Sequence, residues 1–204
     1  MSKAPLGERR VFSNAAYVRV TPWIKDEETD KMEVGTVTYD ITEVVADTMS
    51  VEQADNDVNT IEHEFSSNPL YENIQLGDKT FTCESIDLQN EVLKGLFGWK
   101  GGTKGSDNSV YAPIAYTHLY AVVEIGFHTT ADVVVLPKVL LNSRAVIASM
   151  KTDASRANIT GTCYPAFVND VETDMAIIKE GKNVDDEGAS ILAMVTAEKT
   201  ATGV

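Results

Sequence analysis

Cysteines, histidines and long apolar runs are scarce in this sequence of 204 residues, and each scarcity excludes a class of protein. Two cysteines are too few for the disulfide framework of a small secreted domain. The three histidines, His63, His118 and His128, show neither the i, i+4 spacing of a helical zinc site nor a neighbouring cysteine. No window reaches the roughly 18 consecutive apolar residues of a membrane helix, and the N-terminus leads into no apolar signal-peptide segment. We therefore expect a soluble protein made in the cytoplasm.

Positive charge is also in short supply. The chain has 17 Lys and Arg against 31 Asp and Glu, which gives a formal net charge of −14. Tight binding to nucleic acid relies on Lys and Arg that displace counterions from the phosphates. This composition argues against a protein that grips DNA, but it leaves open a surface past which DNA moves without sticking. Solubility alone is the alternative explanation, because net charge keeps proteins dispersed.

Motifs for catalysis and for cofactors are missing as well. The glycine-rich stretch 98–104 lacks the Gly-Lys-Ser/Thr order of a phosphate-binding loop. Asp55, Asp57 and Asn59 have the spacing that begins a calcium loop, but the Gly and Glu that such a loop needs further on are absent. No Gly-x-Ser-x-Gly elbow and no local Cys–His pair suggests a nucleophile. We therefore expect no catalytic residue, no cofactor, no metal and no enzymatic activity.

What the sequence does contain is a series of strand-like segments. Alternation or β-branched composition predicts strands at 34–41, 61–65, 80–87, 116–128 and 132–136, a hairpin of 138–152 with 155–164, and further strands at 175–178 and 191–195. In 116–128 the odd positions are apolar and the even positions mixed polar, so one face should be buried and the other exposed. Cys83 and Cys163 lie in such segments, which favours buried free thiols; a bond between them stays open.

One segment changes to helical spacing. Apolar residues recur at that spacing from Leu88 to Phe97, with Asp87 placed to cap the start and Gly98 to end the last turn. The pattern predicts a short amphipathic helix over 88–97, followed by a glycine-rich loop.

The order of these segments divides the chain into three parts. Residues 1–33 form an N-terminal arm, 34–165 a β-rich core, and 166–204 a C-terminal extension or additional strands. A long polar loop at 42–60 interrupts the core, and loops of this length in compact domains usually have a function or are disordered. We therefore expect a mainly β protein, a β-sandwich with one short α-helix.

The stretch from Ile61 to Gly98 combines the Glu-rich strand 61–65, the segment Asn68-Pro69-Leu70-Tyr71-Glu72, the turn Gly77-Asp78-Lys79 and a helix that ends in Leu96-Phe97-Gly98. In this order of elements it resembles the phage tail tube (major tail) protein family. Residues 116–165 also follow the strand order of the family, so the resemblance covers about two-thirds of the chain. It implies a two-sheet sandwich flanked by a helix, assembled as a ring oligomer whose strands close one inner β-barrel. Ring closure would remove the open β-edges that otherwise cause aggregation.

The resemblance also implies a function. The chain would be a structural subunit of a tail tube, polymerised as stacked, hexameric rings around a lumen through which genomic DNA passes during ejection. Its partners would be further copies of itself, other tail proteins at the tube ends, a sheath in a contractile tail, and DNA in transit, with no membrane. The protein would be located in the virion after assembly in the bacterial host cytoplasm.

Two sets of residues acquire roles through the resemblance. The loop that matches 42–60 in the family reaches an adjacent ring, so four apolar side chains would be subunit contacts: Val44, Val45, Met49 and Val51. The alternative is a hairpin packed on its own domain. Three carboxylates would face the lumen and repel DNA: Glu62, Glu64 and Glu124. The alternative places these three on a solvent-facing outer sheet.

Two further classes of function remain as alternatives. Another tube or tail-completion protein of a phage or of a contractile injection system would share the fold, and tube length in micrographs would separate it. A β-rich ligand-binding module would be a stable monomer with a pocket, whereas a tube subunit forms rings or polymers.

Overall fold

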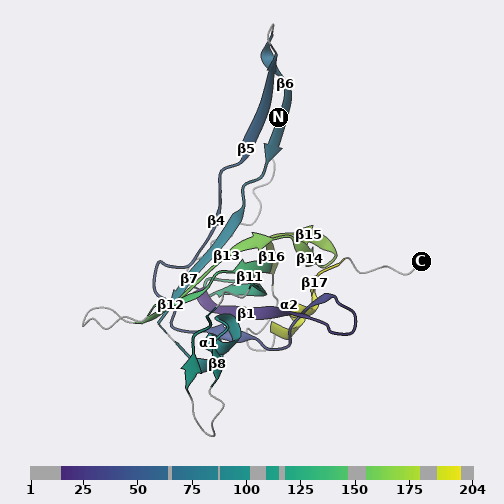
Figure 1. Cartoon of the computed structure of the whole chain (residues 1–204). Coiled ribbons are helices and arrows are strands. Elements are labelled where there is room, and N and C mark those ends of the chain that lie inside the picture. Colours follow the sequence, from purple (N-terminus) through teal and green to yellow (C-terminus); the bar gives the residue numbers. More distant parts are fainter. Residues whose placement is uncertain are drawn as a thin grey trace.

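The protein is described by a computed structural model over residues 15–63, 66–86, 88–101, 109–114, 118–146, 155–179 and 188–198. Figure 1 shows a β-rich body from which a two-stranded hairpin projects. All the strand pairs in the described ranges are antiparallel. The mainly β fold class predicted from the sequence is therefore confirmed.

Within these ranges one sheet joins ten strands. They are β1 (Ala15–Lys25), β2 (Met32–Val34), β3 (Tyr39–Ile41), β4 (Ser50–Gln53), β7 (Lys79–Ser85), β10 (Leu119–Phe127), β11 (Thr130–Leu141), β12 (Arg144–Val146), β13 (Arg156–Tyr164) and β16 (Ala176–Lys179). The central order is β2-β1-β10-β11-β13-β7-β4, with β3 beside β1, β16 beside β11 and β12 beside β13. A separate pair, β8 (Lys100–Gly101) and β9 (Val110–Tyr111), follows the first helix.

The sheet curls until its two sides meet. The chain that continues from β3 reaches the end of β7, where Val45 N donates to Glu84 O at 2.8 Å and Ile86 N donates to Glu43 O at 3.2 Å. The curled sheet encloses the main core, a cluster of apolar side chains from β1, β3, β7, β10, β11, β13 and the first helix. Phe81, Val123 and Ile159 are fully buried there.

The short helix predicted from periodicity is present as α1 (Asn90–Leu96). Three of its residues are buried in the main core: Val92, Leu93 and Leu96. Gly98 takes a φ of 67°, a left-handed conformation that glycine adopts without strain, and the helix ends just before it. Asp87, the predicted capping residue, lies outside the described residues.

Residues that follow β13 cover the outer face of β1, β10 and β11. β14 (Ala166–Val168), β15 (Val171–Thr173) and β17 (Val195–Thr196) form a small sheet, and α2 (Gly188–Ala193) leads into β17. Their apolar side chains form the outer core with residues of the main sheet: Trp23, Val122, Val133, Val135, Ala166, Val168, Ile191 and Val195. The segment after residue 165 is thus strand-rich and packs on the body.

This covering layer corrects three predictions. The even positions of β10 were expected to be exposed, yet Val122 and Glu124 are each 1% exposed. Val122 packs in the outer core against the residues that follow β13. The apolar run 191–195 is mostly α2 rather than a strand, whereas 175–178 is confirmed as part of β16. The described residues therefore contain two helices, α1 and α2, where the sequence predicted one.

Two strands extend further than the sequence indicated. β1 pairs with β10 along Ala15–Pro22, so residues from 15 onward belong to the body rather than to an N-terminal arm. β11 continues through Pro137, where the prediction ended the strand. Its register against β10 shifts between Ala121 and Val123, close to the proline, which has no N–H to donate to a ladder. The carbonyl of Pro137 accepts a hydrogen bond from Trp23 Nε1 at 3.0 Å.

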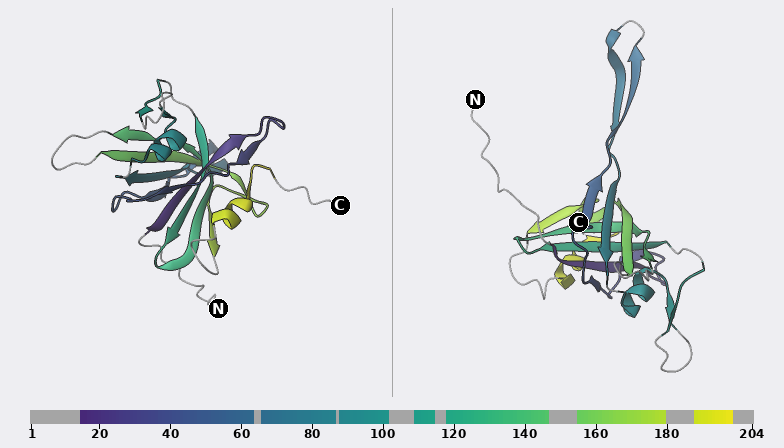
Figure 2. Two further views of the ribbon diagram at one scale, coloured as in Figure 1. Left: turned by 90° about the horizontal axis from the view of Figure 1, so that it is seen from below. Right: turned by 90° about the vertical axis from the view of Figure 1, so that its left-hand side faces the viewer.

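β4 and β7 run on into the projecting hairpin. β5 (Asp57–His63) and β6 (Ser66–Gln75) pair with each other and, among the described residues, with no third strand. The hairpin arm, residues 54–78, stands clear of the body in Figures 1 and 2. The second half of the predicted 42–60 loop is therefore β-strand. Gly77-Asp78 interrupts one long hairpin instead of reversing the chain.

Candidate functional site

The four predicted subunit contacts share one wall of a groove. Val44, Val45, Met49 and Val51 line a hollow of ≈ 640 Å³, which we call the core groove. Its other walls come from the ends of β1, β10, β11 and β16, with these side chains: Ala15, Ile125, Phe127, Val134, Met175 and Ile177. The structure therefore brings the four residues together, but at the open end of the main core of their own subunit.

The segment before β4 is held tightly against the body. Glu84 N of β7 donates to Thr48 Oγ1 at 3.2 Å, and Ser85 Oγ donates to Thr42 O at 2.6 Å. Val44, Met49 and Val51 are half-buried and pack on the main core. This packing fits the alternative in which the segment lies on its own domain. The element that reaches away from the body is the hairpin arm.

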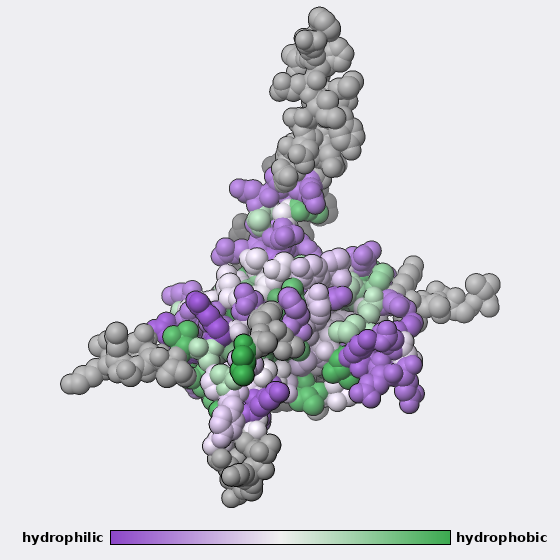
Figure 3. Space-filling view, in the orientation of Figure 1, coloured by the Kyte–Doolittle hydropathy of each residue, from purple (hydrophilic) through white to green (hydrophobic). Residues whose placement is uncertain are grey.

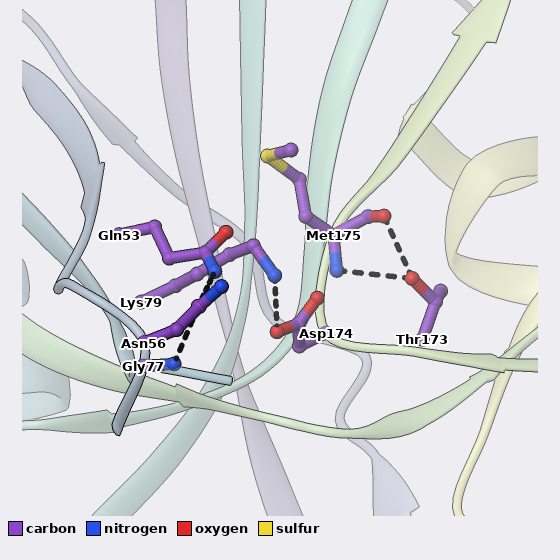
Figure 4. A network of polar contacts seen from close by, with 7 residues as sticks. All are labelled: Gln53, Asn56, Gly77, Lys79, Thr173, Asp174 and Met175. Carbon is purple, nitrogen blue, oxygen red and sulfur yellow. Dashed lines mark hydrogen bonds and ion pairs between the residues drawn. The ribbon is translucent and has the colours of Figure 1, made fainter. Parts of the chain in front are cut away.

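An ion pair braces the base of the arm. Lys79 Nζ lies 2.6 Å from Asp174 Oδ2, and the two side chains are 16% and 33% exposed (Figure 4). Beside it, Asn56 Oδ1 accepts from Gly77 N at 3.3 Å and from Gln53 Nε2 at 3.4 Å. The first residue of β7 is thus tied to the turn before β16, which fixes the point where the arm leaves the body.

Breaking this pair is expected to destabilise the body. Asp174→Asn leaves the Lys79 ammonium partly buried without its counter-charge, so the free energy of unfolding should fall by about 1–2 kcal/mol. A Lys79→Met, Asp174→Leu double variant should lose less, because neither charge remains. Urea denaturation measures both. Lys31→Met is the matched control, since the Lys31–Glu198 pair is mostly exposed and its loss should leave the free energy of unfolding nearly unchanged.

The three predicted lumen carboxylates have different outcomes. Glu62 lies on β5, where the structure describes the backbone alone, and Glu64 lies outside the described residues. Glu124 is buried, with 1% of its surface exposed, so in this subunit its carboxylate does not face solvent or a lumen. That placement corrects the expectation for Glu124.

Glu124 has an unusual environment that the sequence did not reveal. Neither carboxylate oxygen has a hydrogen-bond partner among the described residues. Arg19 of β1 is its neighbour in register, and Asp40 of β3 lies next in the same row. Arg19 Nε donates to Asp40 Oδ1 at 3.0 Å. Burial raises the pKa of Glu124 to about 7, against the opposing effect of the Arg19 charge.

The described residues contain no cluster of side chains that would form a metal site or a reactive thiol. No three His, Cys, Asp or Glu side chains among them gather as a metal site. Cys83 and Cys163 are free and buried, and burial raises their pKa values to about 12 and about 11. Neither of the helices in the described ranges is long and apolar enough to cross a membrane.

The distribution of apolar residues on the surface adds no further strong candidate for a functional site. On the face drawn in Figure 3, apolar residues form separate patches among polar ones. Single exposed apolar side chains such as Leu76, at the base of the arm, are common on soluble proteins. The arm and the core groove are therefore the stronger candidates for interaction.

Comparisons with known proteins do not identify a family. No family model and no curated protein matches the sequence. Among solved structures, a chain of the "Cryo-EM structure of the anti-feeding prophage (AFP) baseplate, 6-fold symmetrised" is 10% identical, with 87% of this chain and 97% of that chain covered, at a TM-score of 0.37. A similarity at this level carries no argument about function. The fold class rests on the strand pairing of this chain itself.

Proposed function

We propose that this chain is a structural subunit of a phage-type tail tube, polymerised as stacked, hexameric rings around a lumen through which DNA passes. The observation that carries the proposal is the hairpin arm, which stands clear of the body without a third strand in the described ranges. An isolated two-stranded hairpin is marginally stable in water. An arm of this kind is expected to be ordered against another molecule, and a neighbouring copy supplies that surface.

The open edges of the main sheet support the same assembly. In the described part of the chain, β2, β4 and β16 end the sheet without a further strand, whereas the chain after β3 bridges to β7. Exposed edges pair with other chains unless they are covered. A closed ring of identical subunits covers every edge in the same way, which an isolated monomer does not. The inner barrel of the proposed ring would be built from such edges.

The charge of the chain suits a conduit for DNA. A net charge of −14 offers few cationic groups to phosphates, and repulsion acts over a screening length of about 8 Å at physiological salt. Glu62, on β5 of the arm, and Glu64, outside the described residues, remain the proposed lumen carboxylates. Further copies, tail proteins at the tube ends and a sheath are the proposed partners, in a virion.

A ligand-binding module is the second candidate, and the core groove is the observation that favours it. Its volume of ≈ 640 Å³ lies within the range of small-molecule sites, which are also mostly apolar. This candidate gives no role to the projecting arm. It requires a stable monomer, so the oligomeric state separates the two functions.

Negative-stain microscopy of the purified full-length chain tests the proposal. At rising protein concentration we expect rings or tubes with a stain-filled hole, and light scattering should give a mass near six subunits or a multiple of it. Single particles of monomer mass at every concentration, with no bore in any assembly, would rule the proposal out. Tubes of fixed length beside a sheath would instead favour an injection-system component.

A further inference from the structure

The core groove is an opening into the main core. Ile125 and Val134, on its floor, are 1% and 8% exposed, while Ile177 on its rim is 37% exposed. Apolar surface that is removed from water contributes about 25 cal/mol per Å². An apolar segment that filled the groove would therefore stabilise the subunit.

The start of the described chain lies on this groove. Ala15, the first residue of β1, lines it next to its register partner Phe127. Ala15 and Phe127 also border an adjoining hollow of ≈ 950 Å³, where Arg19 and Asp40 form an ion pair and Glu43 adds a further negative charge. Ala15, to which residues 1–14 are attached, thus lies where the two hollows meet.

The sequence of those residues complements the groove. Val11-Phe12 is an apolar pair three to four positions before Ala15, and a chain extends at most about 3.6 Å per residue, so Phe12 stays within about 11 Å of Ala15. Arg9-Arg10 precede the pair. Residues 1–14 hold three basic groups and one acidic group, a net +2, which leaves −16 for the rest of the −14 chain. Asp47 lines the groove and Glu43 the adjoining hollow.

We propose that the core groove is the docking site for this chain's own N-terminal segment, with Val11 and Phe12 in the groove and Arg9 and Arg10 facing Glu43 and Asp47. The segment is tethered to the rim, so its effective concentration is of millimolar order and exceeds that of a second copy in dilute solution. Docking closes the open end of the main core. The inference does not depend on the proposed function.

Disulfide trapping tests the docking in the full-length chain. A Phe12→Cys, Ile177→Cys variant is oxidised at low protein concentration and analysed by non-reducing electrophoresis and mass spectrometry. Ile24→Cys replaces Ile177→Cys in the control, because Ile24 is 51% exposed and lies nine positions along β1, roughly 30 Å from Ala15. The native thiols are buried and react slowly.

We expect a cross-linked monomer that forms at least about tenfold faster than in the control pair. A cross-linked dimer through the same two positions would overturn the proposal in favour of a second copy as occupant. Equal rates in the two pairs would also overturn it.

A second measurement avoids engineered thiols. Phe12→Asp should lower the melting temperature by about 3 °C, since a lost apolar contact of roughly 1 kcal/mol shifts a chain of this size by that amount. Leu6→Asp, outside the docked pair, should leave the melting temperature unchanged. An unchanged value for Phe12→Asp contradicts the docking.

Discussion

Shortening the hairpin arm is expected to leave a folded subunit that no longer forms rings or tubes. The variant replaces residues 55–77 with an Asn-Gly turn between Ala54 and Asp78. Ala54 N donates to Asp78 O at 2.9 Å, so these residues already face each other across the hairpin. A two-residue Asn-Gly loop is the commonest connection for such a pair.

The body should tolerate this change. β4 and β7 keep their pairing from Ser50↔Thr82 to Gln53↔Lys79, and Lys79 keeps Asp174. No residue of 55–77 whose side chain the structure describes belongs to the main core. We therefore expect the free energy of unfolding to change by less than about 1 kcal/mol, while polymerisation is lost, as measured by urea denaturation and by light scattering.

A shortened connection elsewhere provides the matched control. Residues 102–109 lie between Gly101 of β8 and Val110 of β9, which pair with each other, and an Asn-Gly turn can replace them in the same way. This control should assemble like the full chain. If the arm-shortened variant formed rings of normal size, the arm would have no part in assembly. If the full chain also stayed monomeric, the tube proposal itself would fail.

Local patterns in the sequence predicted local structure well. The helix was found because its apolar spacing and Gly98 act within one turn of chain, and α1 ends where that glycine takes its positive φ. The alternation from Leu119 to Phe127 likewise became β10. The same signal was present in β1, where Val18 and Val20 alternate with Arg19, but it was assigned to an arm.

Properties that depend on distant contacts were not predictable in this way. The sequence of β10 does not say what covers its second face, and the cover comes from residues more than 40 positions later. The core groove joins the segment 44–51 with β10, β11 and β16, so its existence depends on the curl of the sheet. The family resemblance singled out Val44, Val45, Met49 and Val51, which form one wall of the core groove. It did not indicate that these four side chains are half-buried against their own subunit.

The sequence-based expectation and the structure differ most at Glu124. Replacing this residue is also expected to have the largest effect on the free energy of unfolding. Among the described residues its carboxylate is buried with no hydrogen bond, one positive neighbour in register and one negative group beyond it. A glutamate on a strand face that the alternation predicted to be exposed carried no sequence signal for this burial. Burying a carboxyl group costs much less free energy when the group is protonated than when it is ionised, because the protonated form carries no net charge.

The pH dependence of stability follows from the raised pKa. Burial moves the pKa of Glu124 from 4.5 to about 7, so the folded state holds this proton more tightly than the unfolded state. Its contribution to stability is therefore fully present below pH 4.5 and is lost as the pH rises through 7. At about 1.4 kcal/mol per pKa unit, the loss is roughly 3 kcal/mol.

Glu124→Gln isolates this contribution, because glutamine has the shape of the protonated carboxyl but does not ionise. We expect the variant to match the parent near pH 4.5 and to be more stable by up to about 3 kcal/mol at pH 8, measured by urea denaturation across that range. The arm-shortened chain is the better background, since assembly then adds nothing to the apparent stability. Glu52→Gln, exposed on β4, is the control and should leave the pH profile of the parent unchanged. If Glu124→Gln and its parent kept a constant difference from pH 4.5 to pH 8, the carboxylate would have to be paired or solvated in solution.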